Sequence, residues 1–201
     1  MVAIIDYDAG NIKSVEKAIQ FLGEEAVITR EKDILLSSDH VILPGVGAFG
    51  DAMEKLEKYE LVDVIKEITG KGTPFLGICL GLQLLFESSE EAPGVQGLGI
   101  LKGKIKKFPE NQGLKVPQIG WNSLKYDNPG RLFRDVPEYS YVYFVHSYYL
   151  EAADSAIVKA STEYIVNVHA SVEQDNVFAC QFHPEKSSDT GLKILKNFIS
   201  I

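Results

Sequence analysis

Short apolar segments alternate, along the first half of the chain, with segments in which apolar residues recur every three or four positions. The apolar segments VAIIDY, AVIT, HVILP and PFLGI, at residues 2–7, 26–29, 40–44 and 74–78, have the length and β-branched content of buried strands. The segments near residues 11–21, 49–58, 60–70 and 80–87 have the spacing of amphipathic helices. This alternation predicts a parallel sheet with helices on its faces.

The pattern changes near residue 98 to strands and turns, which include LGILKGKIKKF, QIGWNSLKY, YSYVYFVHSYYL, AIVKAS and NVFACQF. This half favours antiparallel pairing, and PENQGLKVP at residues 109–117 is interpreted as a loop. The segment TGLKILKNFIS predicts a closing helix, capped near Asp189 or Thr190. Because no repeat, linker or low-complexity segment interrupts the chain, we expect a single domain over residues 1–201.

Composition narrows the classes of function. With 45% hydrophobic residues among 201, the chain can bury a full core. The formal charge of −8 argues against a general electrostatic attraction to nucleic acid or to an anionic membrane, and the basic run KGKIKK at 102–107 is interpreted as an exposed strand face. No apolar run reaches the ~18 residues that span a bilayer, and no basic segment precedes the first apolar stretch. We therefore expect a cytoplasmic protein.

The two cysteines and four histidines match neither a disulfide framework nor the spacing of a zinc site. We therefore expect no metal and no cofactor. Cys180 lies inside an expected strand and is interpreted as a core residue. Cys79 instead lies between two glycines at the end of an apolar strand, so any special role for it is catalytic.

The segment GICLG at residues 77–81 has the G-x-nucleophile-x-G form of a nucleophile elbow, with Cys79 in the place of serine. This elbow is a tight turn from a strand into a helix, so the nucleophile needs small neighbours. The helix N-terminus favours the thiolate form of Cys79, and the N–H of Leu80 can donate to an oxyanion. Gln83 lies four residues beyond Cys79, on the same helix face, and is expected to line the pocket.

A cysteine nucleophile needs a base, and His183 is the best placed of the four histidines. His183 follows the expected strand NVFACQF, and Glu185 faces the same way two residues later, so it can orient the imidazole. Cys79, His183 and Glu185 thus complete a candidate triad. The other histidines are interpreted as structural, site-lining or surface residues: His40, His146 and His169.

The segment GVGAFG at residues 45–50 also matches the G-x-G-x-x-G fingerprint of dinucleotide-binding sites. That fingerprint requires an acidic residue about 20 residues further on, at the end of the following strand. Here the following strand ends at Cys79, so nucleotide binding is not expected. Residues 44–47 are interpreted as a loop beside the elbow, whose N–H groups can supply a second oxyanion donor.

With this triad in place, the chain resembles the triad-type (class I) glutamine amidotransferases from residue 6 to residue 188. The motifs DYDAGNIKSV, LPGVGAFGDAM, GICLGLQLLFE, PQIGWN, YFVHSYY and QFHPEKSS occur in that order. They resemble those of the free-standing glutaminase subunits that supply ammonia to a (βα)₈-barrel cyclase in histidine biosynthesis. The resemblance implies an α/β three-layer sandwich, with a mainly parallel central sheet between helices and antiparallel strands in the C-terminal half. It also implies hydrolysis of L-glutamine to glutamate and ammonia.

The resemblance implies a role for each matching residue. Cys79 attacks the carboxamide carbon, His183 protonates the departing ammonia and later activates water, and Glu185 orients His183. The residues that offer oxyanion N–H groups are Gly47 and Leu80. The residues that hold the amino and carboxylate ends of glutamine are Gln83, Glu91, Ser147 and Tyr148. The residues that face the cyclase partner and its ammonia gate are Asn11, Trp121, Tyr143 and Lys186.

The resemblance further implies that the glutaminase is nearly silent alone and that the Val46–Gly47 peptide reorients when the partner is loaded. Two alternatives remain open. A small-amide hydrolase on the same scaffold, such as a γ-glutamyl hydrolase or a cysteine peptidase, would be active without a partner. A binding or scaffolding subunit would not use the triad at all.

Overall fold

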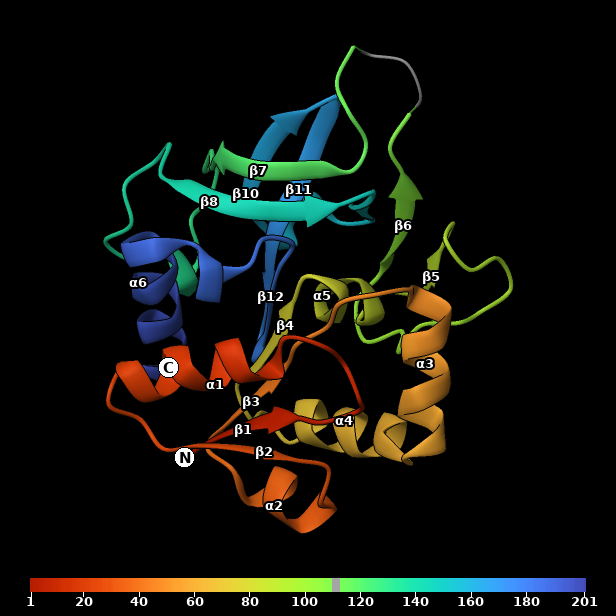
Figure 1. Cartoon of the computed structure of the whole chain (residues 1–201), viewed down its shortest axis with the longest axis vertical. Helices are drawn as coiled ribbons and strands as arrows, with labels where there is room; N and C mark the ends of the chain where they lie inside the picture. The colour runs from red at the N-terminus through yellow and green to blue at the C-terminus, as the bar shows by residue number, and fades with distance from the viewer. Residues whose placement is uncertain (110–112) are drawn as a thin grey trace.

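Seven strands form the central sheet of the computed structural model, which describes residues 1–109 and 113–201 (Figure 1). Residues 110–112, part of the expected loop at 109–117, lie outside the described residues. The seven strands are β1 (Val2–Ile5), β2 (Ala26–Thr29), β3 (His40–Leu43), β4 (Phe75–Ile78), β10 (Val158–Tyr164), β11 (Val166–Gln174) and β12 (Val177–Cys180). Their order in the sheet is β10-β11-β12-β4-β3-β1-β2.

The strands from β12 to β2 run parallel, whereas β10 and β11 are antiparallel to their neighbours. The register aligns Cys180 with Ile78 and Leu43 with Gly77. Because β3, β4 and β12 point the same way, their carboxyl ends meet at one edge of the sheet. The segments that follow them therefore meet at that edge, as is common for ligand sites of open α/β sheets.

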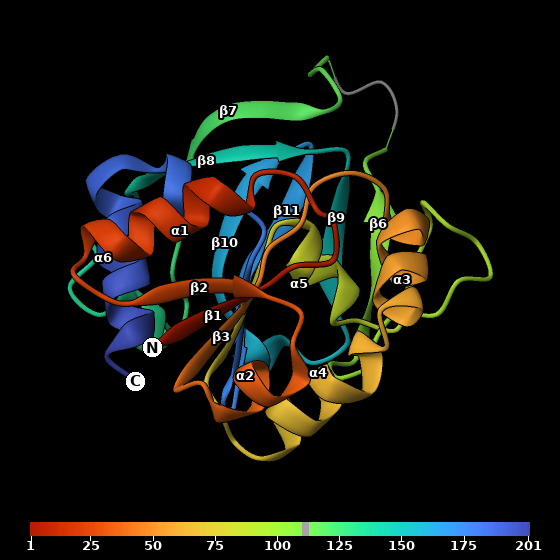
Figure 2. The ribbon, with the colours of Figure 1, turned by 60° about the horizontal axis from the view of Figure 1, so that its bottom comes forward.

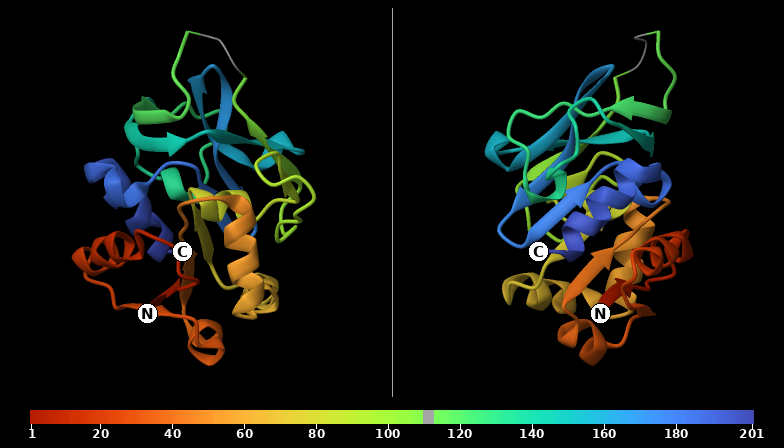
Figure 3. Two further views of the ribbon diagram at one scale, coloured as in Figure 1. Left: turned by 45° about the vertical axis from the view of Figure 1, so that its right-hand side comes forward. Right: turned by 90° about the vertical axis from the view of Figure 1, so that its left-hand side faces the viewer.

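Helices cover both faces of this sheet, since the parallel strands are buried on both sides. The helices are α1 (Ile12–Phe21), α2 (Lys32–Ser37), α3 (Phe49–Lys58), α4 (Leu61–Gly70), α5 (Leu80–Leu84) and α6 (Ser188–Ile199). Figures 2 and 3 show α1 and α6 on one side of the sheet and α3 and α4 on the other. Successive residues of β1 enter different cores: Ile4 packs with α1 and α6, and Ile5 packs with α3 and α4. The expected three-layer α/β sandwich is confirmed.

Two smaller sheets lie beyond the carboxyl edge. The three-stranded sheet contains β5 (Ser88–Ser89), β6 (Gly103–Lys107) and β9 (Tyr148–Ala152), and the antiparallel pair contains β7 (Gln118–Ser123) and β8 (Tyr141–His146). The described residues also form the short 3₁₀ helices η1 (Arg131–Phe133), η2 (Ser155–Ile157) and η3 (Pro184–Lys186). In β6, Lys104 is exposed while Ile105 is buried, so the basic run forms an exposed strand face, as expected. None of the helices in the described ranges is long and apolar enough to cross a membrane.

Two helix boundaries differ from their expected positions, and one short helix was not expected. Helix α2 was not expected, and α5 ends at Leu84 rather than near residue 87, because Leu85 and Phe86 donate to carbonyls only three residues back. Helix α6 begins at Ser188, so the expected cap at Asp189 or Thr190 is wrong. Its N-cap residue, Ser187, does not cap the helix with its side chain, which instead donates to the His183 carbonyl at 2.6 Å.

Phe178 on β12 is fully buried and packs edge-on against Phe198 of α6, with ring centroids 5.9 Å apart. We expect Phe178→Ala to lower the free energy of unfolding by about 3–5 kcal/mol, because it removes a packed ring and leaves a cavity. Phe21→Ala is the matched control, since Phe21 is 77% exposed, and should change stability by less than about 0.5 kcal/mol. Urea unfolding measures both; equal losses would contradict this description of the core.

Candidate active site

Cys79 lies on a tight turn between β4 and α5. Its backbone angles, φ 55° and ψ −108°, lie in a region that residues other than glycine rarely adopt, so the turn is strained. The backbone N–H of Cys79 donates to the carbonyl of Cys180 at 2.8 Å, which ties the turn to the end of β12. The G-x-C-x-G segment therefore has the expected strand–turn–helix geometry, with the cysteine side chain 6% exposed.

The glycines on either side of Cys79 are required by close backbone approach. A Cβ atom at Gly81 would lie 1.9 Å from the carbonyl oxygen of Leu43. A Cβ atom at Gly77 would lie 2.8 Å from the carbonyl oxygen of Gly81. Any larger residue would push α5 away from the ends of β3 and β4.

His183 and Glu185 form a buried hydrogen-bonded pair beside this turn. The distance from His183 Nδ1 to Glu185 Oε1 is 2.8 Å, and the side chains are 2% and 0% exposed. Asn11 donates from Nδ2 to the same carboxylate oxygen at 2.8 Å. Burial lowers the pKa of His183, but its interactions with Cys79 and Glu185 outweigh burial and raise that pKa to about 10. The imidazole is therefore protonated at neutral pH.

A cavity of about 310 Å³ joins the cysteine and the histidine. Its lining also includes every residue expected to hold glutamine: Gln83, Glu91, Ser147 and Tyr148. These four residues come from α5, from the segment after β5, from the β8–β9 connection and from the start of β9, so only the fold brings them together. Glu91 is held in place because its Oε2 accepts the N–H of Phe49, at the start of α3, at 2.8 Å.

The two expected oxyanion donors, Gly47 and Leu80, also line the cavity. In this structure the N–H of Leu80 donates to the carbonyl of Gly45 at 3.3 Å. Gly47 has φ 104°, a conformation that side chains rarely adopt. An oxyanion can use the Leu80 N–H only if the Gly45 carbonyl gives up that bond.

The four residues expected at a partner interface are divided between the site and the surface. Asn11 is part of the site, because it contacts Glu185. Trp121 on β7 is 52% exposed and meets the ring of Tyr143 on β8 edge-on, at 6.1 Å between centroids. Lys186 lies with its Nζ 6.0 Å from the centre of the Tyr143 ring. None of these four residues lines the cavity itself.

Comparison with known proteins assigns the family. The sequence profile described as "Glutamine amidotransferase class-I" matches residues 3–201. The chain belongs to the class I glutamine amidotransferases. It is 50% identical over 198 residues to "Imidazole glycerol phosphate synthase subunit HisH" of Bacillus cereus strain G9842, a match that covers 98% of this chain and 93% of that one. The protein of the same name from Moorella thermoacetica is 48% identical over 197 residues, with 98% and 93% covered.

A solved structure described as PurLQS from Thermotoga maritima has the same fold. It superposes on this amidotransferase with a TM-score of 0.77 and 21% sequence identity, and the match covers 99% of this chain and 97% of that one. At this identity the likeness concerns the fold alone.

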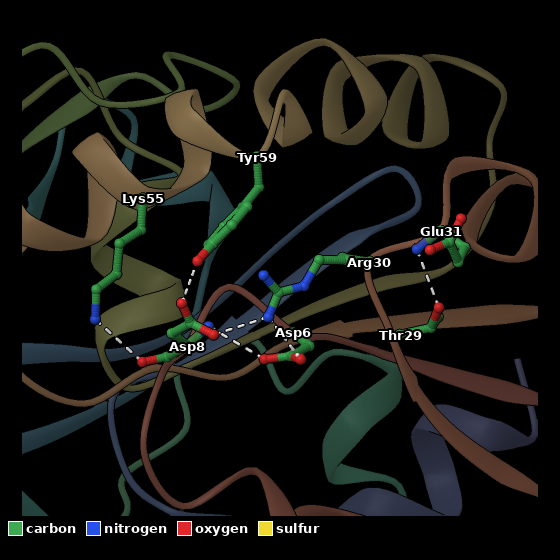
Figure 4. Close-up of polar contacts among 7 residues, drawn as sticks. All are labelled: Asp6, Asp8, Thr29, Arg30, Glu31, Lys55 and Tyr59. Carbon is green, nitrogen blue, oxygen red and sulfur yellow. Dashed lines mark hydrogen bonds and ion pairs between the residues drawn. The ribbon is translucent and has the colours of Figure 1, made fainter.

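A polar cluster fixes the β1–α1 loop of this amidotransferase (Figure 4). The same loop ends at Asn11, the N-cap residue of α1. Arg30 Nη2 lies 2.8 Å from Asp6 Oδ2 and 2.8 Å from Asp8 Oδ1. The hydroxyl of Tyr59, the residue that follows α3, donates to the other Asp8 oxygen, and the Arg30 guanidinium lies over the Tyr59 ring at 4.0 Å. Hydrogen bonds from Tyr59 and Arg30 lower the pKa of Asp8, so its carboxylate stays charged. Arg30 and Tyr59 thus hold the first part of the loop, and Asn11 at its end contacts Glu185.

Sequence reasoning missed two buried polar residues near the amidotransferase cavity, Gln118 and Gln181. His146, interpreted as structural or site-lining, does line the cavity. His146 lies with Nδ1 2.8 Å from the Tyr148 carbonyl and Nε2 2.8 Å from the Gln118 amide. Burial lowers the pKa of His146 to about 4, so it is neutral. Gln181 lies 3.7 Å from the Cys79 sulfur. Gln181 could have been found in the sequence because it lies two residues before His183, directly after the same strand.

The described residues contain no group of three or more His, Cys, Asp and Glu side chains that could hold a metal ion. The groups that the site does contain are a thiol, an imidazolium, a carboxylate and backbone N–H groups. This set suits nucleophilic attack on an amide carbonyl.

We expect Gly81→Ala to destabilise the fold strongly and to abolish glutaminase activity, because its Cβ cannot fit against the Leu43 carbonyl. Gly70→Ala is the matched control, since a Cβ there meets nothing within 4 Å and Gly70 ends a helix. Thermal unfolding and glutamate release measure both variants. A Gly81→Ala protein with wild-type stability would contradict the close approach described here.

The raised pKa of His183 predicts a charged imidazole well above pH 7. The folded protein holds this proton more tightly than the unfolded chain, so the stabilisation is complete below pH 6.5 and is lost as the pH rises toward about 10. Glu185→Gln should shift the His183 titration to lower pH, because it removes one of the interactions that raise it. NMR titration of imidazole nitrogens detects the shift, and an unchanged titration would show that Glu185 does not hold the proton.

Proposed function

We propose that this chain is the glutaminase subunit of an imidazole glycerol phosphate synthase. It hydrolyses L-glutamine to glutamate and ammonia, and the ammonia passes to a (βα)₈-barrel cyclase subunit that makes imidazole glycerol phosphate and AICAR in histidine biosynthesis. One observation carries the proposal: Cys79 and the His183–Glu185 pair converge on a single small cavity. Proteins named as subunits of this synthase are 50% and 48% identical to this chain over 198 and 197 residues, and this likeness supports the choice of reaction.

In the first half of the reaction, the Cys79 sulfur attacks the carboxamide carbon of glutamine. A C–S bond forms, and the carbonyl oxygen becomes an oxyanion that N–H groups of Gly47 and Leu80 stabilise. His183 then gives its proton to the amide nitrogen, the C–N bond breaks, and ammonia leaves. Glu185 holds the imidazole in line for this transfer through the 2.8 Å bond to Nδ1.

In the second half, water hydrolyses the glutamyl thioester. His183, now neutral, takes a proton from water as the oxygen attacks the carbonyl carbon, and the C–S bond breaks to restore the Cys79 thiolate. Glutamate leaves, and the site returns to the thiolate and imidazolium pair. The charged state of His183 at neutral pH, with its pKa near 10, fits this resting form.

The amino end of glutamine requires acceptors and negative charge. The amide nitrogen of Gln83 donates to the Tyr148 carbonyl at 3.3 Å and to Gln181 Oε1 at 3.1 Å. Both of its hydrogens are thereby used, so Gln83 offers the cavity its carbonyl oxygen, which suits an ammonium group. Glu91 adds the charge, while Ser147 and Tyr148 are proposed to hold the substrate carboxylate.

An exposed apolar surface on β7 and β8 supports the proposed cyclase contact. Ile119, Trp121 and Tyr141 are 64%, 52% and 60% exposed, and the β7–β8 register brings these strands into one face. Large exposed apolar groups of this kind are typical of protein interfaces. Pro117 lines the cavity immediately before β7, so ammonia released beside Cys79 is close to this surface.

The bond between Leu80 N–H and the Gly45 carbonyl supports a gated site. A loaded cyclase that favours a different conformation of residues 45–47 would free the Leu80 N–H for the oxyanion, and a ligand that binds both states equally would shift nothing. We propose this reorientation of the Val46–Gly47 peptide as the activating step. We also propose that the chain acts as one domain over residues 1–201, in a heterodimer in the cytoplasm.

Glutamate release from glutamine tests the proposal, measured for the purified chain alone and with the cognate cyclase plus its ribonucleotide substrate. We expect a large rise only in the complete mixture. Cys79→Ala should abolish it, because the nucleophile is lost. Cys180→Ala is the matched control, since Cys180 is fully buried in β12 and is expected to leave the activity intact.

The other outcomes separate the alternatives. Equal activity with and without the cyclase would identify an independent small-amide hydrolase. No activity in the complete mixture, with complex formation shown by gel filtration, would favour a binding subunit. Full activity of Cys79→Ala would rule out the triad chemistry.

A further inference from the structure

The buried side chain of Gln181 contacts the nucleophilic sulfur of Cys79. Gln181 follows β12 directly and is fully buried. Its Nε2 lies 3.7 Å from Cys79 Sγ, within the range of an N–H···S hydrogen bond. Its Oε1 accepts from Gln83 Nε2 at 3.1 Å. Gln181 thus joins the sulfur to the residue proposed to hold the substrate.

The sheet register explains why Gln181 reaches the sulfur. Parallel pairing aligns Cys180 of β12 with Ile78 of β4, so the next residues on the two strands, Gln181 and Cys79, are neighbours at the carboxyl edge. His183 lies two residues beyond Gln181, and both side chains lie next to the same cysteine. One strand end therefore supplies both the imidazole and an amide donor.

The orientation of the Gln181 amide follows from its neighbours. The Tyr148 carbonyl can only accept, so Gln83 must direct its nitrogen toward that carbonyl. The same nitrogen then donates to Gln181, which must direct its oxygen toward Gln83. The remaining end of the Gln181 amide is its nitrogen, and it faces the sulfur. A buried amide in any other orientation would leave polar atoms without partners, which is costly.

The groups around the sulfur favour different protonation states. The Val145 carbonyl, 3.9 Å from Sγ, can accept a bond from a thiol but cannot stabilise a thiolate. The Gln181 N–H group does the opposite, since it donates to the charged sulfur, and such charge-assisted bonds are stronger than neutral ones. Without Gln181, the thiolate would lose this donor and would be stabilised by His183.

We propose that Gln181 is a further catalytic residue of this amidotransferase, whose side-chain amide donates to the Cys79 sulfur, stabilises the thiolate and aims it at the substrate. This inference rests on the proposed glutaminase reaction. It extends the site from a triad to four groups, of which three, Gln181, His183 and Glu185, come from the single segment after β12. Gln181 also fixes the amide of Gln83, so one residue orders both the nucleophile and the pocket.

The rate of alkylation of Cys79 by iodoacetamide, followed against pH in the full-length chain, reports directly on the thiolate. Cys180 is fully buried, and Cys79→Ala gives the background rate. In Gln181→Met we expect the midpoint of the alkylation profile to rise by about one pH unit, and the rate below the midpoint to fall about tenfold. The glutaminase kcat of the complex should fall by a similar factor at neutral pH.

Two further variants separate the sulfur contact from a general loss of packing. Gln181→Glu keeps the size and the oxygen that accepts from Gln83 but replaces the donor, so it should raise the midpoint at least as much as Gln181→Met. Ser171→Ala is the matched control, because Ser171 is also fully buried and its Oγ donates to the Ala179 carbonyl at 2.8 Å, beside β12. It should leave the alkylation midpoint at its wild-type value.

A wild-type alkylation midpoint in folded Gln181→Glu would overturn the inference. If Gln181→Met does not fold, the result for Gln181→Glu is the one that decides. An equal shift in Ser171→Ala would also overturn it, because the effect would then be one of general packing. The alkylation assay contains no glutamine and no cyclase. A shifted midpoint together with a wild-type chain that releases no glutamate would therefore refute the proposed function while Gln181 retained its contact with the thiolate.

Discussion

The strained turn at Cys79, with φ 55° and ψ −108°, holds the catalytic site together. It forces the chain to pass from β4 into α5 within one residue, and this is possible only because Gly81 can lie against the Leu43 carbonyl. The bond from the Cys79 N–H to the Cys180 carbonyl then fixes the turn to β12. Strain of this kind costs about 1–3 kcal/mol and persists only where the surrounding packing holds it. Here the two hydrophobic cores on the faces of the sheet supply that packing.

The second feature of the site is the concentration of polar groups in a buried place. The His183–Glu185 pair is almost completely removed from solvent, and charges in such surroundings are stable only when they are paired and hydrogen-bonded. Asn11 supplies one of these bonds, and the Arg30 cluster holds the loop that carries Asn11. Because the ion pairs of that cluster are partly exposed, they contribute little to stability themselves, and their effect is to position the loop.

Much of the architecture follows from local pattern. The four strands expected in the first half occur within one or two residues of their predicted bounds, because buried parallel strands are continuous apolar segments that stand out from amphipathic helices. Helix ends were less accurate. The end of α5 and the start of α6 depend on bonds to residues brought near by the fold, such as that from Ser187 to the His183 carbonyl. A short helix such as α2, with six residues, leaves too little periodicity to detect.

The amino-acid sequence shows which groups this protein can use: a cysteine in an elbow motif, a histidine and a glutamate two residues apart, and motifs of the class I glutamine amidotransferases. Order along the chain and alternation along a strand are local properties, so they can be read without coordinates. The distance of each group from the sulfur depends instead on how the chain folds. Gln181 contacts Cys79 because β12 pairs in register with β4, and the Leu80 N–H reaches the Gly45 carbonyl because β3 pairs in register with β4. The separation of these residues along the chain carries no information about their distance in space.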